Sequence, residues 1–167
     1  MPRSSSTSCA AVRADVAERI LCLDTTVLIK YLTPDERDEQ ATQLVEGALR
    51  ERLRLIAPAW GWAEVGSVLR KKVRAALLSA DEADALWGAF LDLPIDYTDS
   101  PALRQRAWEI AAHFGLPTLY DAAFIACMDV APHDGTASRE LWTADDQLWR
   151  QLGTGRPPYM RRLGGSS

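Results

Sequence analysis

Short apolar runs alternate with helical patterns along this chain, and this alternation restricts the possible folds more than any other feature of the sequence. Residues 19–23, RILCL, form an apolar run of strand length, and a helical pattern follows at once and ends before Pro34. Apolar residues then recur at helical spacing over 35–53, and residues 54–59, RLIAPA, have the length and composition of a buried strand. Because a helix connects the two strands, we expect them to pair in parallel.

The alternation continues through the rest of the chain. We expect helices at 60–78, 79–93, 100–115 and 119–131, a strand at 94–99, and a closing strand, turn and helix at 140–153. Ser79 or Asp81 can cap the second of these helices. Since both faces of a parallel sheet must be covered, the pattern predicts an α/β protein, a three-layer α/β/α sandwich with a mainly parallel central sheet.

The 167 residues are enough for one domain with its own hydrophobic core, which we place at residues 19–152. Residues 1–18 are expected to be a weakly ordered extension that includes a serine-rich stretch. Residues 153–167 are expected to be a tail, since Gly, Pro and Arg occur there without apolar periodicity. No apolar stretch has the length of a signal-peptide core or a membrane span, so we expect a cytoplasmic protein that does not enter membranes.

The cysteines and histidines indicate neither a redox pair nor a zinc site. Cys9, Cys22 and Cys127 are odd in number and far apart, so we expect reduced thiols, the latter two buried among apolar neighbours. His113 and His133 have no cysteine partner nearby and no H-E-x-x-H context, which argues against zinc.

Four acidic residues stand where an unpaired charge needs an explanation. Asp24 directly follows the first strand, Asp121 begins a helix of otherwise small or apolar residues, and Asp145 lies at the last strand-to-helix turn. Glu64 lies early in a helix whose nearby residues are mostly apolar. Taken singly, each has an ordinary explanation as well: the aspartates can cap the helices that follow them, and Glu64 can be a solvated helix residue.

The recurrence of this arrangement favours metal binding. The four acids are distant in sequence, and a cluster of them would repel itself unless cations held it. Asp24 and Asp145 would lie at the carboxyl ends of parallel strands, where such sheets bind ligands. Carboxylate oxygens suit Mg²⁺ or Mn²⁺, and two such ions about 3.5–4 Å apart can activate water for attack on a phosphodiester. The net charge of −4 does not exclude nucleic acid, because metal-bound carboxylates would leave the rest of the chain neutral.

Four motifs, in this order, resemble those of the PIN-domain nucleases, and among them the VapC-like toxins of toxin–antitoxin pairs. The motifs are LCLDTTVLIKYL with Asp24 and Thr26, WAEVGSVLRKK with Glu64, LYDAAFIACM with Asp121, and LWTADDQL with Thr143 and Asp145. They cover about residues 19–152. Residues 129–140, DVAPHDGTASRE, look longer than is usual for the family, but they remove no acidic position.

The resemblance implies a PIN-like fold and a toxin-type endoribonuclease that hydrolyses RNA phosphodiester bonds with Mg²⁺ or Mn²⁺ and a metal-activated water. In that function Asp24, Glu64, Asp121 and Asp145 are the metal-binding and catalytic residues. The resemblance also implies a homodimer, and an antitoxin protein that occupies the groove and keeps the enzyme inactive.

Three further polar residues lie within these motifs, close to the acids. Thr26 and Thr143 are expected to orient carboxylates or water through hydrogen bonds, and helix or turn capping is their alternative role. Asp146 follows Asp145 directly, so Asp146 can cap the last helix while Asp145 points into the site.

Basic and aromatic residues near the motifs are candidates for contacts with RNA. The helix that carries Glu64 also carries a basic stretch, which we expect to follow the RNA backbone, although a solvated helix face explains it equally well: Arg70, Lys71, Lys72 and Arg74. Several tryptophans could stack on bases, but core packing or a dimer face accounts for them better: Trp60, Trp62, Trp142 and Trp149.

Three other functions fit parts of the sequence. A non-catalytic module could keep the fold and only bind RNA or a protein, but the intact acidic positions disfavour it. A stand-alone RNA-processing nuclease differs from a toxin only in lacking an antitoxin. A phosphatase with an aspartate nucleophile after its first strand usually carries a second aspartate two residues later, where this chain has Thr26.

Overall fold

A single parallel sheet forms the centre of the molecule. The structure, a computed structural model, describes residues 19–132 and 138–164. All neighbouring strands pair in parallel, in the order β3-β2-β1-β4-β5. The strands are β1 (Arg19–Leu23), β2 (Arg54–Pro58), β3 (Ile95–Thr98), β4 (Ser138–Thr143) and β5 (Met160–Arg162).

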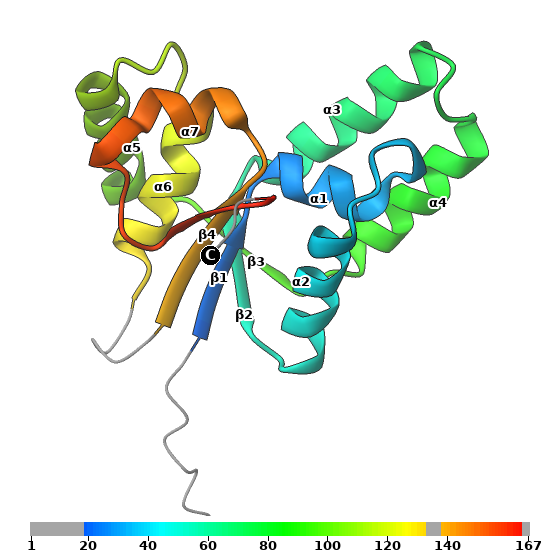
Figure 1. Cartoon of the computed structure of the whole chain (residues 1–167), viewed down its shortest axis with the longest axis horizontal. Coiled ribbons are helices and arrows are strands. Elements are labelled where there is room, and N and C mark those ends of the chain that lie inside the picture. Colours follow the sequence, from blue (N-terminus) through cyan, green and yellow to red (C-terminus); the bar gives the residue numbers. More distant parts are fainter. Residues whose placement is uncertain (1–18, 133–137, 165–167) are drawn as a thin grey trace, which may run out of the picture.

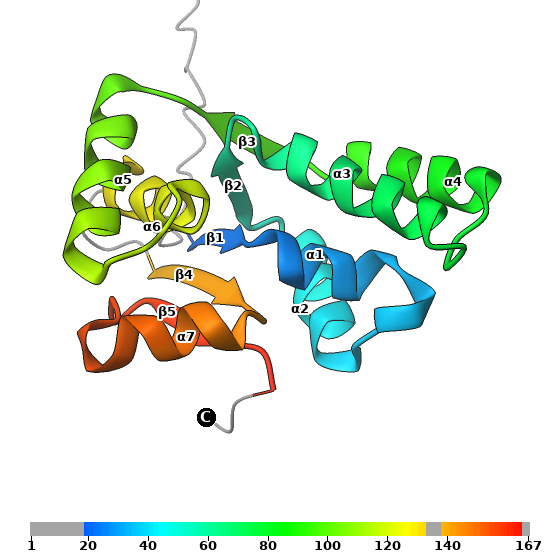
Figure 2. The same ribbon diagram turned by 90° about the horizontal axis from the view of Figure 1, so that it is seen from above.

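Helices cover both faces of this sheet. The helices are α1 (Thr25–Leu32), α2 (Glu39–Arg50), α3 (Gly61–Arg74), α4 (Ala80–Leu91), α5 (Pro101–Phe114), α6 (Tyr120–Val130) and α7 (Asp146–Leu152), with short 3-10 turns η1 (Pro34–Glu36) and η2 (Gly153–Gly155). Figures 1 and 2 show α5, α6 and α7 on one side of the sheet and α1 to α4 on the other. The predicted three-layer α/β/α sandwich is therefore confirmed, and the sheet is parallel throughout its described strands.

The central strand β1 shows why the sheet needs both layers. Its side chains alternate between the two faces, so Ile20 and Cys22 belong to one hydrophobic core and Leu21 and Leu23 to the other. The first core includes α6, whose residues from Ala122 to Met128 are all buried, and the second includes the apolar sides of α1, α2 and α3. The two layers thus hold β1, and the residue that follows it, rigidly in place.

Cysteine burial agrees with the expectation from the sequence. Cys22 and Cys127 are free thiols, and both are fully buried in the core around α6. Cys9 and His133 lie outside the described residues. Within the described ranges, no helix is long and apolar enough to cross a membrane.

The carboxyl-terminal segment differs from the expected tail. Residues 160–162 form β5, which pairs with β4 at the edge of the sheet, and Tyr159, Met160 and Leu163 are buried. The Leu163 amide donates a hydrogen bond to the carbonyl of Thr143 at 2.8 Å. A strand of three residues that contains two arginines has no apolar alternation, so its sequence gives no strand signal.

Helices α3 and α4 form a hairpin that extends away from the sheet (Figures 1 and 2). The expected helix over 60–78 ends earlier, at Arg74, and the chain then turns through Ala76 with φ of 57°. Ser79 begins α4 with a reciprocal capping box, its side chain accepting from the Glu82 amide. The hairpin carries the helix of Glu64 out beyond the edge of the sheet.

Candidate metal centre

The four acidic residues come together at the carboxyl edge of the sheet. Asp24 follows β1, Asp145 follows β4, Glu64 lies in the first turn of α3 and Asp121 in the first turn of α6. All four line one cleft of about 250 Å³. From β1 the strand order continues to β2 and β3 on one side and to β4 and β5 on the other, so the topological switch point lies between β1 and β4. Parallel sheets bind ligands at such a point.

Asp24 is the buried member of this group, and its side chain is held at both oxygens. Its exposed fraction is 7%. Oδ1 accepts hydrogen bonds from the Thr26 amide at 2.5 Å and the Thr26 hydroxyl at 2.6 Å, and Oδ2 accepts from the Thr143 hydroxyl at 2.5 Å. Asp24 is thus the N-cap of α1 and also lines the cleft, so capping does not remove its carboxylate from the candidate site.

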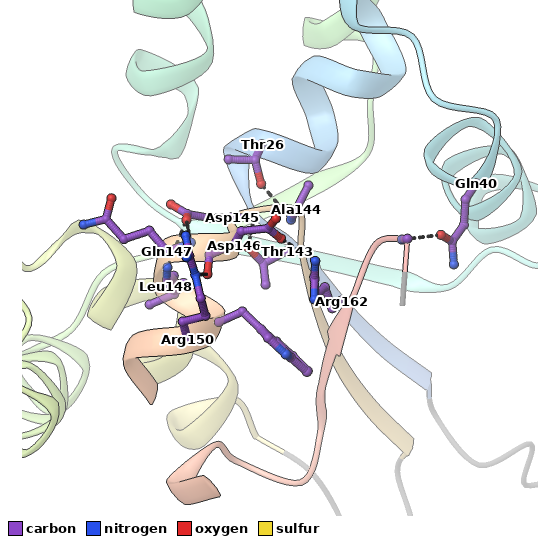
Figure 3. A network of polar contacts seen from close by, with 12 residues as sticks. Thr26, Gln40, Thr143, Ala144, Asp145, Asp146, Gln147, Leu148, Arg150 and Arg162 are labelled. Carbon is purple, nitrogen blue, oxygen red and sulfur yellow. Dashed lines mark hydrogen bonds and ion pairs between the residues drawn. The ribbon is translucent and has the colours of Figure 1, made fainter. Parts of the chain in front are cut away.

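The hydroxyls of Thr26 and Thr143 also hold the turn after β4, as Figure 3 shows. Thr26 accepts a hydrogen bond from the Ala144 amide at 2.9 Å, and Thr143 accepts one from the Asp145 amide at 3.0 Å. Each hydroxyl therefore donates to Asp24 and accepts from the turn that carries Asp145. This is the geometry that a role in orienting the carboxylates requires.

Asp145, and not Asp146, caps the last helix. Asp145 Oδ1 accepts hydrogen bonds from the amides of Gln147 at 2.7 Å and Leu148 at 2.9 Å (Figure 3). Asp146 instead places Oδ1 2.8 Å from Nη2 of Arg162 on β5. The expectation that Asp146 caps this helix is therefore wrong, whereas Asp145 lines the cleft as expected, because one carboxylate can accept from the helix and still face the cleft.

Glu64 has a partner that sequence reasoning missed. The Thr25 hydroxyl donates to Glu64 Oε2 at 2.5 Å, so a residue next to Asp24 fixes the acid from α3. The only sequence signal was the position of Thr25, the first of the two threonines that follow Asp24. Ser67 and Lys71 lie one and two turns beyond Glu64 on α3, and both line the cleft.

Burial and mutual repulsion raise the pKa of two of these acids. Burial, followed by the negative charges of Asp24, Asp145 and Glu64, raises the pKa of Asp121 to about 6. Burial also raises the pKa of Asp24; the hydrogen bonds from Thr143 and Thr26 oppose this rise, and the charge of Asp145 adds to it. A site that makes its own carboxylates hard to ionise is one that a cation would stabilise.

The donor set fits a hard divalent ion. The side chains that line the cleft offer carboxylate and hydroxyl oxygens, and oxygen ligands are the type that Mg²⁺ and Mn²⁺ prefer. Within residues 19–132 and 138–164, no three His, Cys, Asp or Glu side chains are drawn tightly enough together to form a ready-made metal-binding group. The carboxylates thus surround the cleft, an arrangement suited to an ion that keeps several water ligands.

The basic stretch of α3 divides into an exposed part and a buried residue. Arg70, Lys71 and Arg74 are exposed. Lys72, expected from the sequence to join them on RNA, is only 5% exposed, and its Nζ lies 2.5 Å from Asp35 Oδ2 and 2.5 Å from Glu36 Oε1. Burial lowers the pKa of Lys72, but its hydrogen bonds to these two acids outweigh it and the pKa is raised. Lys72 therefore joins η1 to α3 and does not belong to an RNA-binding surface.

Removing this ammonium group should destabilise the protein. We expect Lys72→Ala to lower the free energy of unfolding by about 1–3 kcal/mol, less than for a fully buried pair because Asp35 and Glu36 are partly exposed. Lys71→Ala, at the neighbouring exposed position, is the matched control and should change it by less than about 0.5 kcal/mol. Urea unfolding of both variants measures the difference, and equal stabilities would contradict a structural role for Lys72.

Comparison with known proteins places this arrangement in a family. No curated protein sequence matches the chain significantly. Two crystal structures share its fold, each with a TM-score of 0.56. PAE2754 from Pyrobaculum aerophilum is 19% identical, and the match covers 89% of this chain and 92% of that chain. VapBC2 from Rickettsia felis, in a structure bound to a promoter DNA fragment, is 13% identical, and the match covers 86% of this chain and 98% of that chain.

The family model described as the PIN domain matches residues 21–149. The match covers most of the chain and contains Asp24, Glu64, Asp121 and Asp145. The chain therefore belongs to the PIN domain family, whose members are in general nucleases that depend on divalent metal ions.

Proposed function

We propose that this protein is a metal-dependent endoribonuclease that acts as the toxin of a toxin–antitoxin pair. One observation carries the proposal: four acidic side chains from four separate elements line one cleft, and an exposed basic stretch on α3 reaches that cleft through Lys71. Acidic residues that only cap helices or face solvent do not need to line one cleft. A basic surface beside them suits a substrate whose backbone is a chain of phosphates.

The acids and the threonines of the site have different roles in the proposed reaction. Asp24, Glu64, Asp121 and Asp145 would hold Mg²⁺ or Mn²⁺. When bound, such ions lower the pKa of a coordinated water and offset the negative charge that develops on the phosphate. The threonines keep the acids in position, since Thr25 donates to Glu64, and Thr26 and Thr143 donate to Asp24.

The partners follow from the same proposal. Arg70, Lys71 and Arg74 are exposed on α3, and we propose that they contact the RNA backbone. The structural neighbour from Rickettsia felis is named as a VapBC pair, which supports a protein antitoxin as the partner of this chain. We further propose that the protein works as a homodimer in the cytoplasm.

Metal-dependent cleavage of RNA tests the proposal. Purified, antitoxin-free protein should cleave single-stranded RNA when Mg²⁺ or Mn²⁺ is added, and cleavage should fall to background in EDTA and return when metal is restored. The products are resolved on denaturing gels. RNA binding without cleavage in either metal would contradict the nuclease and favour a binding module, and cleavage that persists in EDTA would contradict the metal requirement.

A further inference from the structure

A second cavity lies beside the cleft, in the groove between α3 and α4. Its volume is about 530 Å³, within the range of about 300–1,000 Å³ that is typical of ligand sites. Figures 1 and 2 show these two helices side by side in the hairpin that extends from the sheet. The groove combines two indoles with three basic side chains: Trp62, Trp87, Arg70, Lys71 and Arg74.

The two tryptophans differ in exposure. Trp62 lies in the first turn of α3, two residues before Glu64, and is 49% exposed. Trp87 of α4 is half-buried and packs its ring against Gly66, where an added Cβ would lie 3.2 Å from Trp87 Cζ3. The glycine therefore lets one indole form the floor of the groove, while the other stands free at its side.

The other tryptophans near the motifs are engaged in the fold. Trp60 makes edge-to-face contacts with Tyr120, with ring centroids 5.0 Å apart, and with Phe124, at 5.5 Å. Trp142 Nε1 donates to Glu140 at 2.9 Å. Arg156 lies over the ring of Trp149, 4.1 Å from its centroid. Core packing thus explains these three rings, but it does not explain an exposed indole beside Glu64.

The charge of the groove is opposite to that of the chain as a whole. The protein carries a net charge of −4. The groove, however, is lined by Arg70, Lys71 and Arg74 and by one acid, Asp84. Cationic side chains next to an aromatic face are the pattern with which proteins hold single-stranded nucleic acid, since the cations contact phosphates and each base has a face that can stack. A peptide could pair with these cations only where it carries carboxylates, whereas every nucleotide of RNA carries a phosphate, so we favour RNA as the occupant.

The groove is continuous with the acidic cleft. Ser67 and Lys71 line both, so these two residues form the border between them. A strand that places a phosphate in the cleft can therefore lay a neighbouring nucleotide in the groove without leaving the surface of α3.

We propose that this groove is a nucleobase subsite: a base of single-stranded RNA, next to the phosphate in the cleft, stacks on Trp62. The phosphates that flank this base contact Arg70, Lys71 and Arg74. The inference rests on the proposed function for its RNA substrate. It adds a site that binds a base of the RNA as well as the backbone.

Binding of RNA in EDTA, where metal-dependent cleavage is blocked, tests this subsite. We measure fluorescence anisotropy of a labelled, random-sequence single-stranded RNA with the full-length protein. Trp62→Ala should weaken binding about 10-fold, as expected when a stacking platform is removed, and Trp62→Phe should restore most of the affinity. Trp108→Ala removes another exposed tryptophan, 64% exposed on α5, and should leave binding unchanged.

Two further measurements separate stacking from other effects. An oligomer of abasic ribose phosphates keeps the charge but lacks bases, so wild type and Trp62→Ala should bind it equally. Trp62→Ala should also keep the salt dependence of RNA binding, whereas Arg70→Glu with Lys71→Glu should flatten it. Circular dichroism confirms that each variant is folded.

The outcomes distinguish this subsite from the nuclease proposal. If wild type cleaves RNA with Mn²⁺ but Trp62→Ala binds RNA as well as wild type, the subsite is overturned and the nuclease stands; a groove used by a protein partner would give this result. If Trp62→Ala weakens binding of intact RNA alone while no metal supports cleavage, the subsite stands and the nuclease fails. Equal losses on intact and abasic oligomers, or a wild-type protein that binds no RNA, also overturn the subsite.

Discussion

Replacing Asp24 with asparagine should reduce RNA cleavage by a factor of about 100 or more while leaving the fold intact. Loss of a group that merely orients a metal ligand costs about 10–100-fold in activity or metal affinity, and Asp24 is itself a proposed ligand with a full charge. Asparagine keeps the shape of the side chain. Its oxygen can still accept from Thr26, and its amide can donate to the hydroxyl of Thr143.

The matched control is Asp146→Asn, because Asp146 is an aspartate near Asp145 that pairs with Arg162 and does not line the cleft. It should retain wild-type cleavage. Initial rates on the same RNA at saturating Mn²⁺ compare the two variants, and thermal melts show whether both are folded. If Asp24→Asn cleaved at the wild-type rate, the four-carboxylate metal centre would be refuted.

Without metal, the folded protein should lose stability as the pH rises from about 4 to 7. Folding raises the pKa of Asp121 from an ordinary value of 3.8 to about 6. An acid whose pKa is raised on folding stabilises the folded state below its ordinary pKa, and this contribution is lost as pH rises through the raised value. The full difference would be about 3 kcal/mol, and because Asp121 is partly exposed we expect about 1–2 kcal/mol.

Urea unfolding in EDTA at half-unit steps of pH measures this change. Asp121→Asn removes the titrating group, so its curve should be flatter and its stability at pH 7 higher than that of wild type. Below about pH 4 the comparison ends, because acids with a lowered pKa then lose their stabilising contribution; these include Asp35, Glu82, Asp99 and Glu109. A wild-type protein whose stability rises between pH 4 and 7 would contradict the expected repulsion at the cleft.

Adding Mg²⁺ or Mn²⁺ should reverse this trend, since a cation binds the ionised acids and stabilises the folded state by mass action.

The sheet and the convergence of the acids could be predicted because both follow from local patterns. The apolar run that ends at Asp24 and the crossover helix after it specify a parallel pair, and in a parallel sheet the residues after each strand meet at one edge. Asp24 and Asp145 were therefore expected together although they are distant in sequence. Glu64 and Asp121 required the family motifs as well, since a helix position alone does not reveal which layer the side chain faces.

The features that sequence reasoning missed depend on contacts between distant elements. Lys72 has the same chemistry as Lys71, and only the packing of η1 against α3 separates a buried ion pair from an exposed cation. Thr25 gained its role from Glu64 on another element. The strand β5 is held by its neighbour β4 and not by its own propensity, so no pattern within residues 160–162 could have indicated it.

The hydrogen bond from Thr143 to Asp24 also determines when, during protein synthesis, the site can form. It joins residues separated by 119 positions, and Asp145 lies two residues beyond Thr143. A growing chain that has not yet emerged as far as β4 lacks a quarter of the acidic cluster and leaves the buried carboxylate of Asp24 without one of its donors. Asp145 must therefore be synthesised before the four acids can line one cleft, so the partner protein proposed above can be present before the proposed nuclease becomes active.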